Sequence, residues 1–220
     1  MQQISGAAAL TVLGHPGFVV PPVPPAATGV GWLRAASGRF STGEAHVRRR
    51  ARYTAILDGI APETLRRRPG AHPVTVLADA MGAGHLAVDL ILDVAQAYQP
   101  GTGDEARADA AVNRLVAALG GGFDEPTAAR IGLLVQACDA TATLAERARH
   151  RPVGEVLRDD PPVPATRRQA LAATVVGGHP VEAGEVVLVD LAGGPAFGAG
   201  PHACPGRAHA LALVECARWV

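Results

Sequence analysis

The segment from Phe197 to Gly206 contains the residue types with the clearest capacity for chemistry. It reads Phe-Gly-Ala-Gly-Pro-His-Ala-Cys-Pro-Gly, so its one cysteine, Cys204, lies among glycines and close to a histidine. A thiolate can act as a nucleophile or a metal ligand, and glycines let the backbone approach a bound group closely. A helical pattern begins after Cys204, and a helix N-terminus favours an anion. The pattern predicts a thiolate site; the alternative is a glycine-rich turn around a buried structural cysteine.

This segment resembles the FGxGxHxCxG haem-binding loop of the cytochromes P450. Besides Cys204, the matching positions are Phe197, Gly198, Gly200, His202 and Gly206. The resemblance implies haem b (iron protoporphyrin IX) as the cofactor, the Cys204 thiolate as the iron ligand, and His202 as a ligand of a haem propionate. In such proteins the iron carries the chemistry, while the protein sets the substrate pose and the proton supply.

Three further matches occur in the order that the resemblance predicts. The first is His46 and Arg50, whose HxxxR spacing puts both side chains on one helix face. The resemblance implies that both bind the propionates, and arginine suits a bidentate contact with a carboxylate. The alternative is that the basic run over 48–52 is only a solvated helix face.

The other two matches lie in the second half of the chain. Glu155 and Arg158 match the family's ExxR, which implies a buried ion pair behind the cysteine loop with a structural role. The alternative is a surface pair one helical turn apart. Positions within residues 168–187 resemble the family's hairpin, and this alignment implies that Arg168 is another propionate ligand.

The chain departs from the family pattern where dioxygen would be activated. Family members carry an acid directly followed by threonine, whereas here an alanine separates Asp139 from Thr141. Either Asp139 is the acid or Thr141 is the alcohol, and in both registers the adjacent pair that supplies protons is broken. Gln136 would be the polar group over the haem in the first register; the alternative places it on the wet side of the helix.

Hydrophobic periodicity and capping signals predict a mainly helical chain with a small β element. The expected helices cover residues 42–57, 73–98 with a division near Gly82 and Gly84, 104–119, 125–149, 152–158 and 205–220. Two valine-rich runs, 168–176 and 181–189, predict a β-hairpin or small sheet. Residues 1–40 are predicted to be an irregular segment packed on the core, and residues 41–220 a single domain.

The resemblance turns this pattern into a reduced cytochrome P450-like fold. The chain has 220 residues, much shorter than the family, and lacks room for the helices that roof the pocket. The meander segment before Phe197 is also missing. The missing roof implies either a pocket that stays open or one that is covered by a second copy in a homodimer or by a partner protein.

Composition excludes several other classes of protein. Twenty acidic and twenty basic side chains cancel, which argues against nucleic acid or an anionic membrane as a partner. Three cysteines without a CxxC pair argue against a disulfide framework and a zinc site. Neither a signal peptide nor a long apolar span is apparent, so we expect a cytoplasmic protein with no membrane attachment.

These features together predict a haem-thiolate oxidoreductase of the monooxygenase type. We expect an atypical tailoring enzyme of specialised metabolism that acts on a small organic substrate at the iron. No flavin or ferredoxin segment is recognised, so electrons would come from a separate ferredoxin or reductase. Two alternatives stay open. One is a P450-derived catalyst of dehydration, rearrangement or cyclisation, with or without haem; the other is a non-catalytic haem-binding accessory or sensor subunit.

Overall fold

The computed structural model describes residues 1–67 and 71–217, without the side chains of Arg67, Cys216 and Ala217. The chain divides into two compact units. The sheet unit consists of Met1–Pro22 and His150–Cys204, and the helical unit consists of Val23–Arg149 and Pro205–Val220. The region that the sequence suggested as one domain, 41–220, is therefore shared between both units.

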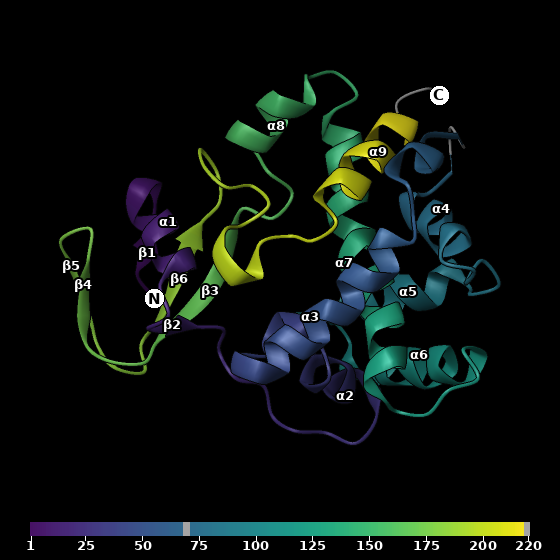
Figure 1. Cartoon of the computed structure of the whole chain (residues 1–220), viewed down its shortest axis with the longest axis horizontal. Helices are drawn as coiled ribbons and strands as arrows, with labels where there is room; N and C mark the ends of the chain where they lie inside the picture. The colour runs from purple at the N-terminus through teal and green to yellow at the C-terminus, as the bar shows by residue number, and fades with distance from the viewer. Residues whose placement is uncertain (68–70, 218–220) are drawn as a thin grey trace. The chain divides into compact units, whose positions relative to one another are not determined.

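The helical unit contains most of the helices (Figure 1). Its elements are α2 (Gly29–Ala35), η1 (Gly38–Phe40), α3 (Gly43–Asp58), η2 (Pro62–Arg67), α4 (Pro73–Ala80), α5 (Val88–Ala95), α6 (Glu105–Ala118), α7 (Glu125–Arg147) and α9 (Arg207–Ala217). Asp104 and Asp124 cap α6 and α7 by accepting hydrogen bonds from backbone amides. Gly82, with a φ of 67°, separates α4 from α5 as predicted.

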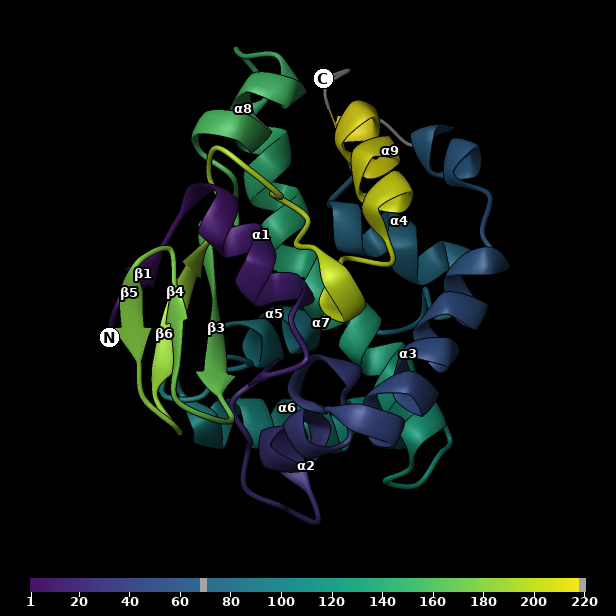
Figure 2. The same ribbon diagram turned by 60° about the vertical axis from the view of Figure 1, so that its left-hand side comes forward.

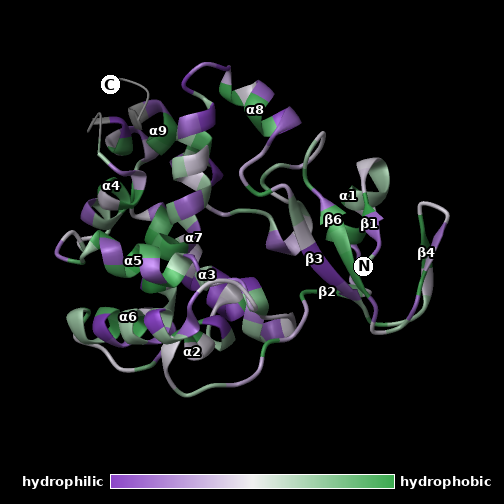
Figure 3. Ribbon diagram, turned by 180° about the vertical axis from the view of Figure 1, so that it is seen from behind, coloured by the Kyte–Doolittle hydropathy of each residue, from purple (hydrophilic) through white to green (hydrophobic). Residues whose placement is uncertain are grey.

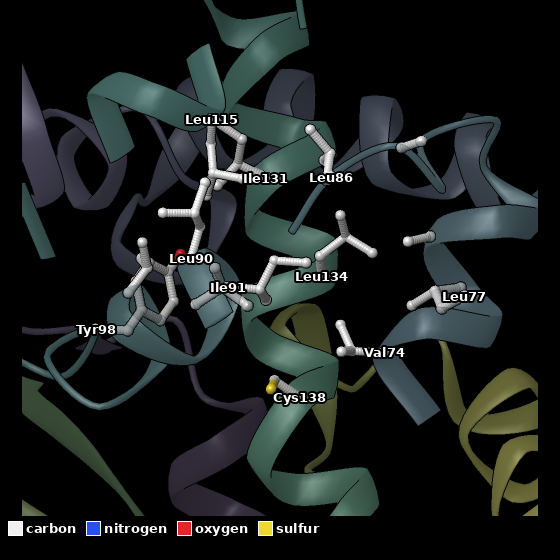
Figure 4. Packing of buried hydrophobic residues seen from close by; sticks show 14 of the residues in the cluster. Val74, Leu77, Leu86, Leu90, Ile91, Tyr98, Leu115, Ile131, Leu134 and Cys138 are labelled. Carbon is white, nitrogen blue, oxygen red and sulfur yellow. The ribbon is translucent and has the colours of Figure 1, made fainter. Parts of the chain in front are cut away.

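Helix α7 lies at the centre of this unit, and its apolar side chains meet those of α4, α5 and α6 (Figure 4). Ile131 and Leu134 of α7 pack among Ile91 and Leu115, and all four side chains are almost fully buried. The longer helices alternate apolar and polar residues along their length (Figure 3), which is the pattern of helices that turn an apolar stripe toward the core. Burial of these stripes is the main stabilising term for the unit.

The sheet unit is built on a four-stranded sheet in the order β1-β6-β3-β2. Its elements are β1 (Gln3–Ile4), α1 (Gly6–Gly14), β2 (Phe18–Val19), α8 (Val153–Asp159), β3 (Ala165–Ala170), β4 (Thr174–Val176), β5 (His179–Val181), β6 (Val186–Asp190) and η3 (Gly200–His202). The strands β3 and β6 pair antiparallel, β1 joins β6 in parallel, and β4 pairs with β5 as a separate hairpin. Helix α1 lies across the sheet (Figure 2) and packs on it through Ala9, Val12 and Leu13.

The prediction of an irregular segment over 1–40 is wrong for most of that segment. It contains β1, α1 and β2, then α2 and η1. Its longest stretch without a helix or strand is the proline-rich part at residues 20–28. The glycine-, proline- and alanine-rich composition of this segment suggested irregular chain. It did not reveal α1, because this short helix is stabilised by packing on β6 and has no strong hydrophobic periodicity of its own.

The predicted fold class is confirmed as mainly helical with a small sheet. The helices expected over 42–57, 104–119, 125–149 and 152–158 are all present within a few residues of the predicted ends. Among the described residues, no helix combines the length and the apolar character needed to cross a membrane.

Candidate functional site

The Cys204 loop is a tight turn at the end of the sheet unit. The backbone amide of Cys204 donates to the carbonyl oxygen of Phe197 at 2.7 Å, which closes the loop on itself. The amide of Gly198 donates to the carbonyl oxygen of Pro195 at 2.6 Å. Both Gly198 and Gly200 have positive φ angles, 72° and 65°, which L residues rarely adopt. The loop therefore presents Cys204 as an exposed residue on a backbone that glycines permit.

Gly200 also packs closely on helix α1. A Cβ at this position would collide with the carbonyl oxygen of Leu13 and lie 3.0 Å from the Cα of Gly14. Two independent features therefore require glycine at this position: the positive φ angle of the backbone and the close approach of α1. The sequence could not show the second reason, because α1 was not predicted.

The environment of the cysteines identifies which of them can supply a thiolate. Cys138 is fully buried in the core of the helical unit, and burial raises the pKa of its thiol to about 12. It is therefore a protonated core residue at neutral pH. Cys204 is exposed, and helix α9 begins three residues after it. The side chain of Cys216 lies outside the described residues.

Arg168 is a buried cation of the sheet unit. It lies on β3 opposite Val187 of β6 and is only 4% exposed. Its guanidinium donates to the Thr166 hydroxyl at 3.2 Å and to the Arg167 carbonyl oxygen at 2.8 Å. His202, in η3, is half-buried. A buried arginine needs anionic or hydrogen-bonding partners, so the guanidinium of Arg168 is suited to bind a carboxylate.

The ExxR pair needs a correction. Arg158 donates from Nε to Asp159 at 2.8 Å, and its side chain is 62% exposed. Glu155 is also exposed. The pair is thus no buried ion pair, because α8 is a short helix that buries only Val156 and leaves both charged side chains in water. Exposed pairs of this kind add little stability.

His46 is buried in the helical unit, on α3. Its Nδ1 lies 2.9 Å from the carbonyl oxygen of Gly38. A carbonyl only accepts hydrogen bonds, so Nδ1 carries the proton and donates it. Arg50, one turn later, is half-buried, and its backbone packs against Gly38. The turn at Gly38 therefore holds both members of the HxxxR pair on one side of α3.

The other arginines of the basic run bind Glu125 in the first turn of α7. Arg48 makes two hydrogen bonds to the carboxylate, at 2.8 and 3.0 Å, and Arg49 makes one at 2.9 Å. Arg52 adds an ion pair at 3.5 Å. The Arg48 hydrogen bonds lower the pKa of Glu125 to about 2, with burial opposing the shift and Arg49 adding to it. Arg48, Arg49 and Arg52 are thus tied to α7, and Arg50 is not one of the three.

We expect Glu125→Gln to lower the free energy of unfolding at pH 7 by about 1 to 2 kcal/mol. The folded pKa lies below the ordinary value of 4.5, so this stability is complete above pH 4.5 and is lost as the pH falls toward about 2. Urea titrations across this pH range should show wild type and variant converging in acid. Glu146→Gln, which breaks only the exposed pair with Arg149, is the control and should have almost no effect. Equal losses in both variants would refute the arginine cluster as a stabilising element.

The three distal candidates lie on α7 in different surroundings. Gln136 is half-buried, and its Nε2 donates to the Gly132 carbonyl oxygen at 2.9 Å. Asp139 is exposed, and its charge opposes the lowering of the His72 pKa that burial produces. Thr141 is buried. The helix thus gives Asp139 and Thr141 different environments, in keeping with a broken acid–alcohol pair.

A buried polar cluster beside Gln136 was missed in the sequence. The hydroxyls of Tyr53 and Tyr98 donate to the Ser37 hydroxyl at 3.4 and 2.7 Å. Burial raises the pKa of Tyr53, and hydrogen bonds with Ser37, the Gly38 backbone and Gln136 oppose the shift. Burial also raises the pKa of Tyr98. Both phenols are therefore neutral donors, and the only available signal was the rarity of tyrosine in this chain.

The candidate residues belong to both units of the chain. Those of the sheet unit are Glu155, Arg158, Arg168, Phe197, Gly198, Gly200, His202 and Cys204, and those of the helical unit are His46, Arg50, Gln136, Asp139, Thr141 and Gly206. Among the described residues, no group of three or more histidine, cysteine, aspartate or glutamate side chains could hold a metal ion.

Comparison with solved structures places this architecture among the cytochromes P450. P450 TxtC, which is described as hydroxylating thaxtomin, superposes with a TM-score of 0.66 at 18% identity, covering 98% of this chain and 83% of its own. P450 RauA, solved with a biosynthetic intermediate of aurachin RE, gives 0.64 at 17% identity, with 94% and 80% covered. A ligand-free cytochrome P450 of Mycobacterium smegmatis gives 0.62 at 18% identity, with 96% and 79% covered.

On this comparison, the chain has a cytochrome P450 fold in a reduced form. No family model and no curated protein matches the sequence. At identities below one fifth the likeness establishes the architecture, while the chemistry must be argued from the residues themselves.

Proposed function

We propose that this protein is a haem-thiolate enzyme in which the Cys204 thiolate would hold the haem iron. One observation carries the proposal: Cys204 is exposed on a loop whose positive-φ glycines and closing hydrogen bond leave the thiol accessible. The P450 fold of the whole chain supports it. The other cysteine whose side chain is described, Cys138, is buried and protonated.

The residues that would hold haem b fit its chemistry. Cys204 supplies a soft anionic ligand. Arg168 and His202 of the sheet unit, and His46 and Arg50 of the helical unit, are the residues that the sequence resemblance assigns to the two propionates. Haem bound through a thiolate would supply oxidative chemistry at the iron. The chain's own groups would orient the substrate, and Gln136 would be a polar group that handles protons on α7.

The proposed reaction class is oxidation of a small organic molecule in specialised metabolism. Support comes from the solved structures with this fold, which include proteins described in thaxtomin hydroxylation and with an aurachin RE intermediate. Electrons would come from a separate ferredoxin or reductase. A homodimer or a partner protein would cover the substrate pocket.

The experiment that tests this proposal is an absorption spectrum of the purified protein, reduced and exposed to carbon monoxide. A red-shifted Soret band of the thiolate type, with one haem per chain in a haemin titration, would establish both cofactor and ligand. Haem bound with an unshifted band would refute Cys204 as the ligand. A protein that binds no haemin would refute the haem-dependent function altogether.

A second candidate is a catalyst of dehydration, rearrangement or cyclisation that does not activate oxygen. It is favoured by the surroundings of Asp139 and Thr141, one exposed and the other buried, with an alanine between them. Turnover of a substrate without any reductant would support this candidate. Substrate-dependent oxygen consumption would refute it, and an absence of turnover in both assays would leave an accessory or sensor subunit.

A further inference from the structure

His209 joins the first turn of α9 to the end of α3. Its Nε2 lies 2.8 Å from the carbonyl oxygen of Ile60 and 3.1 Å from that of Leu57. Because carbonyls only accept, Nε2 carries the proton and donates to both. Helix α3 ends at Asp58, and the Leu57 carbonyl in its last turn already accepts from the backbone amides of Gly59 and of Ile60, the latter at 2.9 Å, so His209 adds a side-chain donor at this end. His209 therefore closes the end of α3 from a different helix.

Gly206 makes a second contact with the same point. A Cβ added to Gly206 would lie 3.6 Å from Cδ1 of Leu57, so this glycine already rests on that side chain. Further along α9, Leu213 is buried with Ile60 and Leu65 in the core of the helical unit. The start of α9 is thus fixed on the end of α3 by one hydrogen-bonding ring and one close backbone contact.

The connection from this anchor to Cys204 is short and stiff. Only Pro205 separates Cys204 from Gly206, and the proline ring fixes its φ angle. On the other side, the Cys204 amide is held by the carbonyl oxygen of Phe197. Along the chain, Cys204 therefore closes the loop hydrogen bond with Phe197 and precedes the His209 anchor by five residues.

The second ring nitrogen of His209, Nδ1, indicates that this residue is present for its hydrogen bonds and not to fill space. Its Nδ1 is buried, and among the described residues it has no hydrogen-bond partner. A buried acceptor without a donor is unfavourable. An apolar side chain of similar size would fill the space without that penalty but could not donate to the two carbonyls.

We propose that His209 is a positioning residue for Cys204, acting through the start of α9 to hold the thiolate in the geometry of an iron ligand. This inference rests on the proposed haem-thiolate function. His209 does not itself touch the iron in this proposal; it restrains the chain that carries the ligand.

Two variants of similar size separate donation from packing. In His209→Gln the amide nitrogen takes the place of Nε2 and keeps the donor. In His209→Asn the amide nitrogen takes the place of Nδ1 and loses both carbonyls. Glu215→Gln is the control for general loosening of α9, because it removes only the exposed ion pair with Arg66.

The first readout is the reduced carbon monoxide spectrum of the haem-loaded variants. We expect His209→Asn to convert at least half of the red-shifted band into the unshifted band that marks loss or protonation of the thiolate. His209→Gln and Glu215→Gln should keep the wild-type spectrum. A wild-type spectrum in His209→Asn would overturn the proposal, as would an equal loss of the band in all three variants.

The second readout needs no haem and keeps the two proposals distinguishable. Exchange of the backbone amides of Cys204 and Ala210 should be about tenfold faster in His209→Asn than in His209→Gln, because one ordinary hydrogen bond is worth about that factor in local opening. If the wild type binds no haem, the proposed function fails while this measurement still tests the anchor. Equal exchange in both variants would refute the anchoring role.

Discussion

Cys204→Ala should abolish the red-shifted carbon monoxide band completely. The shift requires a thiolate ligand of the iron, and alanine offers no ligand. The substitution should leave folding intact, because Cys204 is exposed and its amide bond to the Phe197 carbonyl involves only the backbone. The measurement is the reduced difference spectrum of the variant after reconstitution with haemin, with far-UV circular dichroism as the check on folding.

The matched control is Cys138→Ala, which removes a thiol that burial keeps protonated. This variant should lose some stability, since Cys138 is fully buried in the helical core. Its haem spectrum should equal that of the wild type. A red-shifted band that survives Cys204→Ala, or disappears in Cys138→Ala, would show that the ligand has been assigned to the wrong cysteine.

Gly200→Ala should destabilise the sheet unit by about 2 to 4 kcal/mol. The backbone here has a φ of 65°, which costs an L residue energy by itself. The new methyl group would also collide with the Leu13 carbonyl of α1, so either the loop or α1 must move. Amide exchange in β3 and β6 reports on this unit separately from the helical unit.

Gly198→Ala is the control for this prediction, because it has a similar φ of 72° but a Cβ would meet only ordinary contacts, at 3.5 Å and beyond. Gly198→Ala should lower the free energy of unfolding by about 1 kcal/mol, which is the contribution of the backbone conformation alone. The difference between the two variants measures the close packing of Gly200 on α1. Equal losses would mean that α1 yields freely and that only the backbone conformation selects glycine.

Much of the helical unit could be predicted from the sequence. The helices α3, α6 and α7 follow from the spacing of apolar residues and from caps such as Asp104 and Asp124, which are properties of neighbouring residues. The Cys204 loop could also be recognised, because its residue types and spacing are local. Its role in ligation stays a prediction that the spectra above will test.

The tertiary structure decided the features that depend on residues far apart in the chain. Helix α1 and the strand β1 exist because they pack on β6, some 180 residues later. Glu125 became the partner of the arginines on α3, and Asp159 the partner of Arg158, because distance and exposure select between competing charges.

The second requirement for glycine at position 200 and the role of His209 have the same origin. Each depends on a contact with a backbone carbonyl, of Leu13 in one case and of Leu57 and Ile60 in the other. Carbonyl groups are common to every residue, so no side-chain pattern marks where one will be close. Local periodicity and motif spacing therefore determined the helices and the candidate thiolate, while only the folded chain determined what holds them in place.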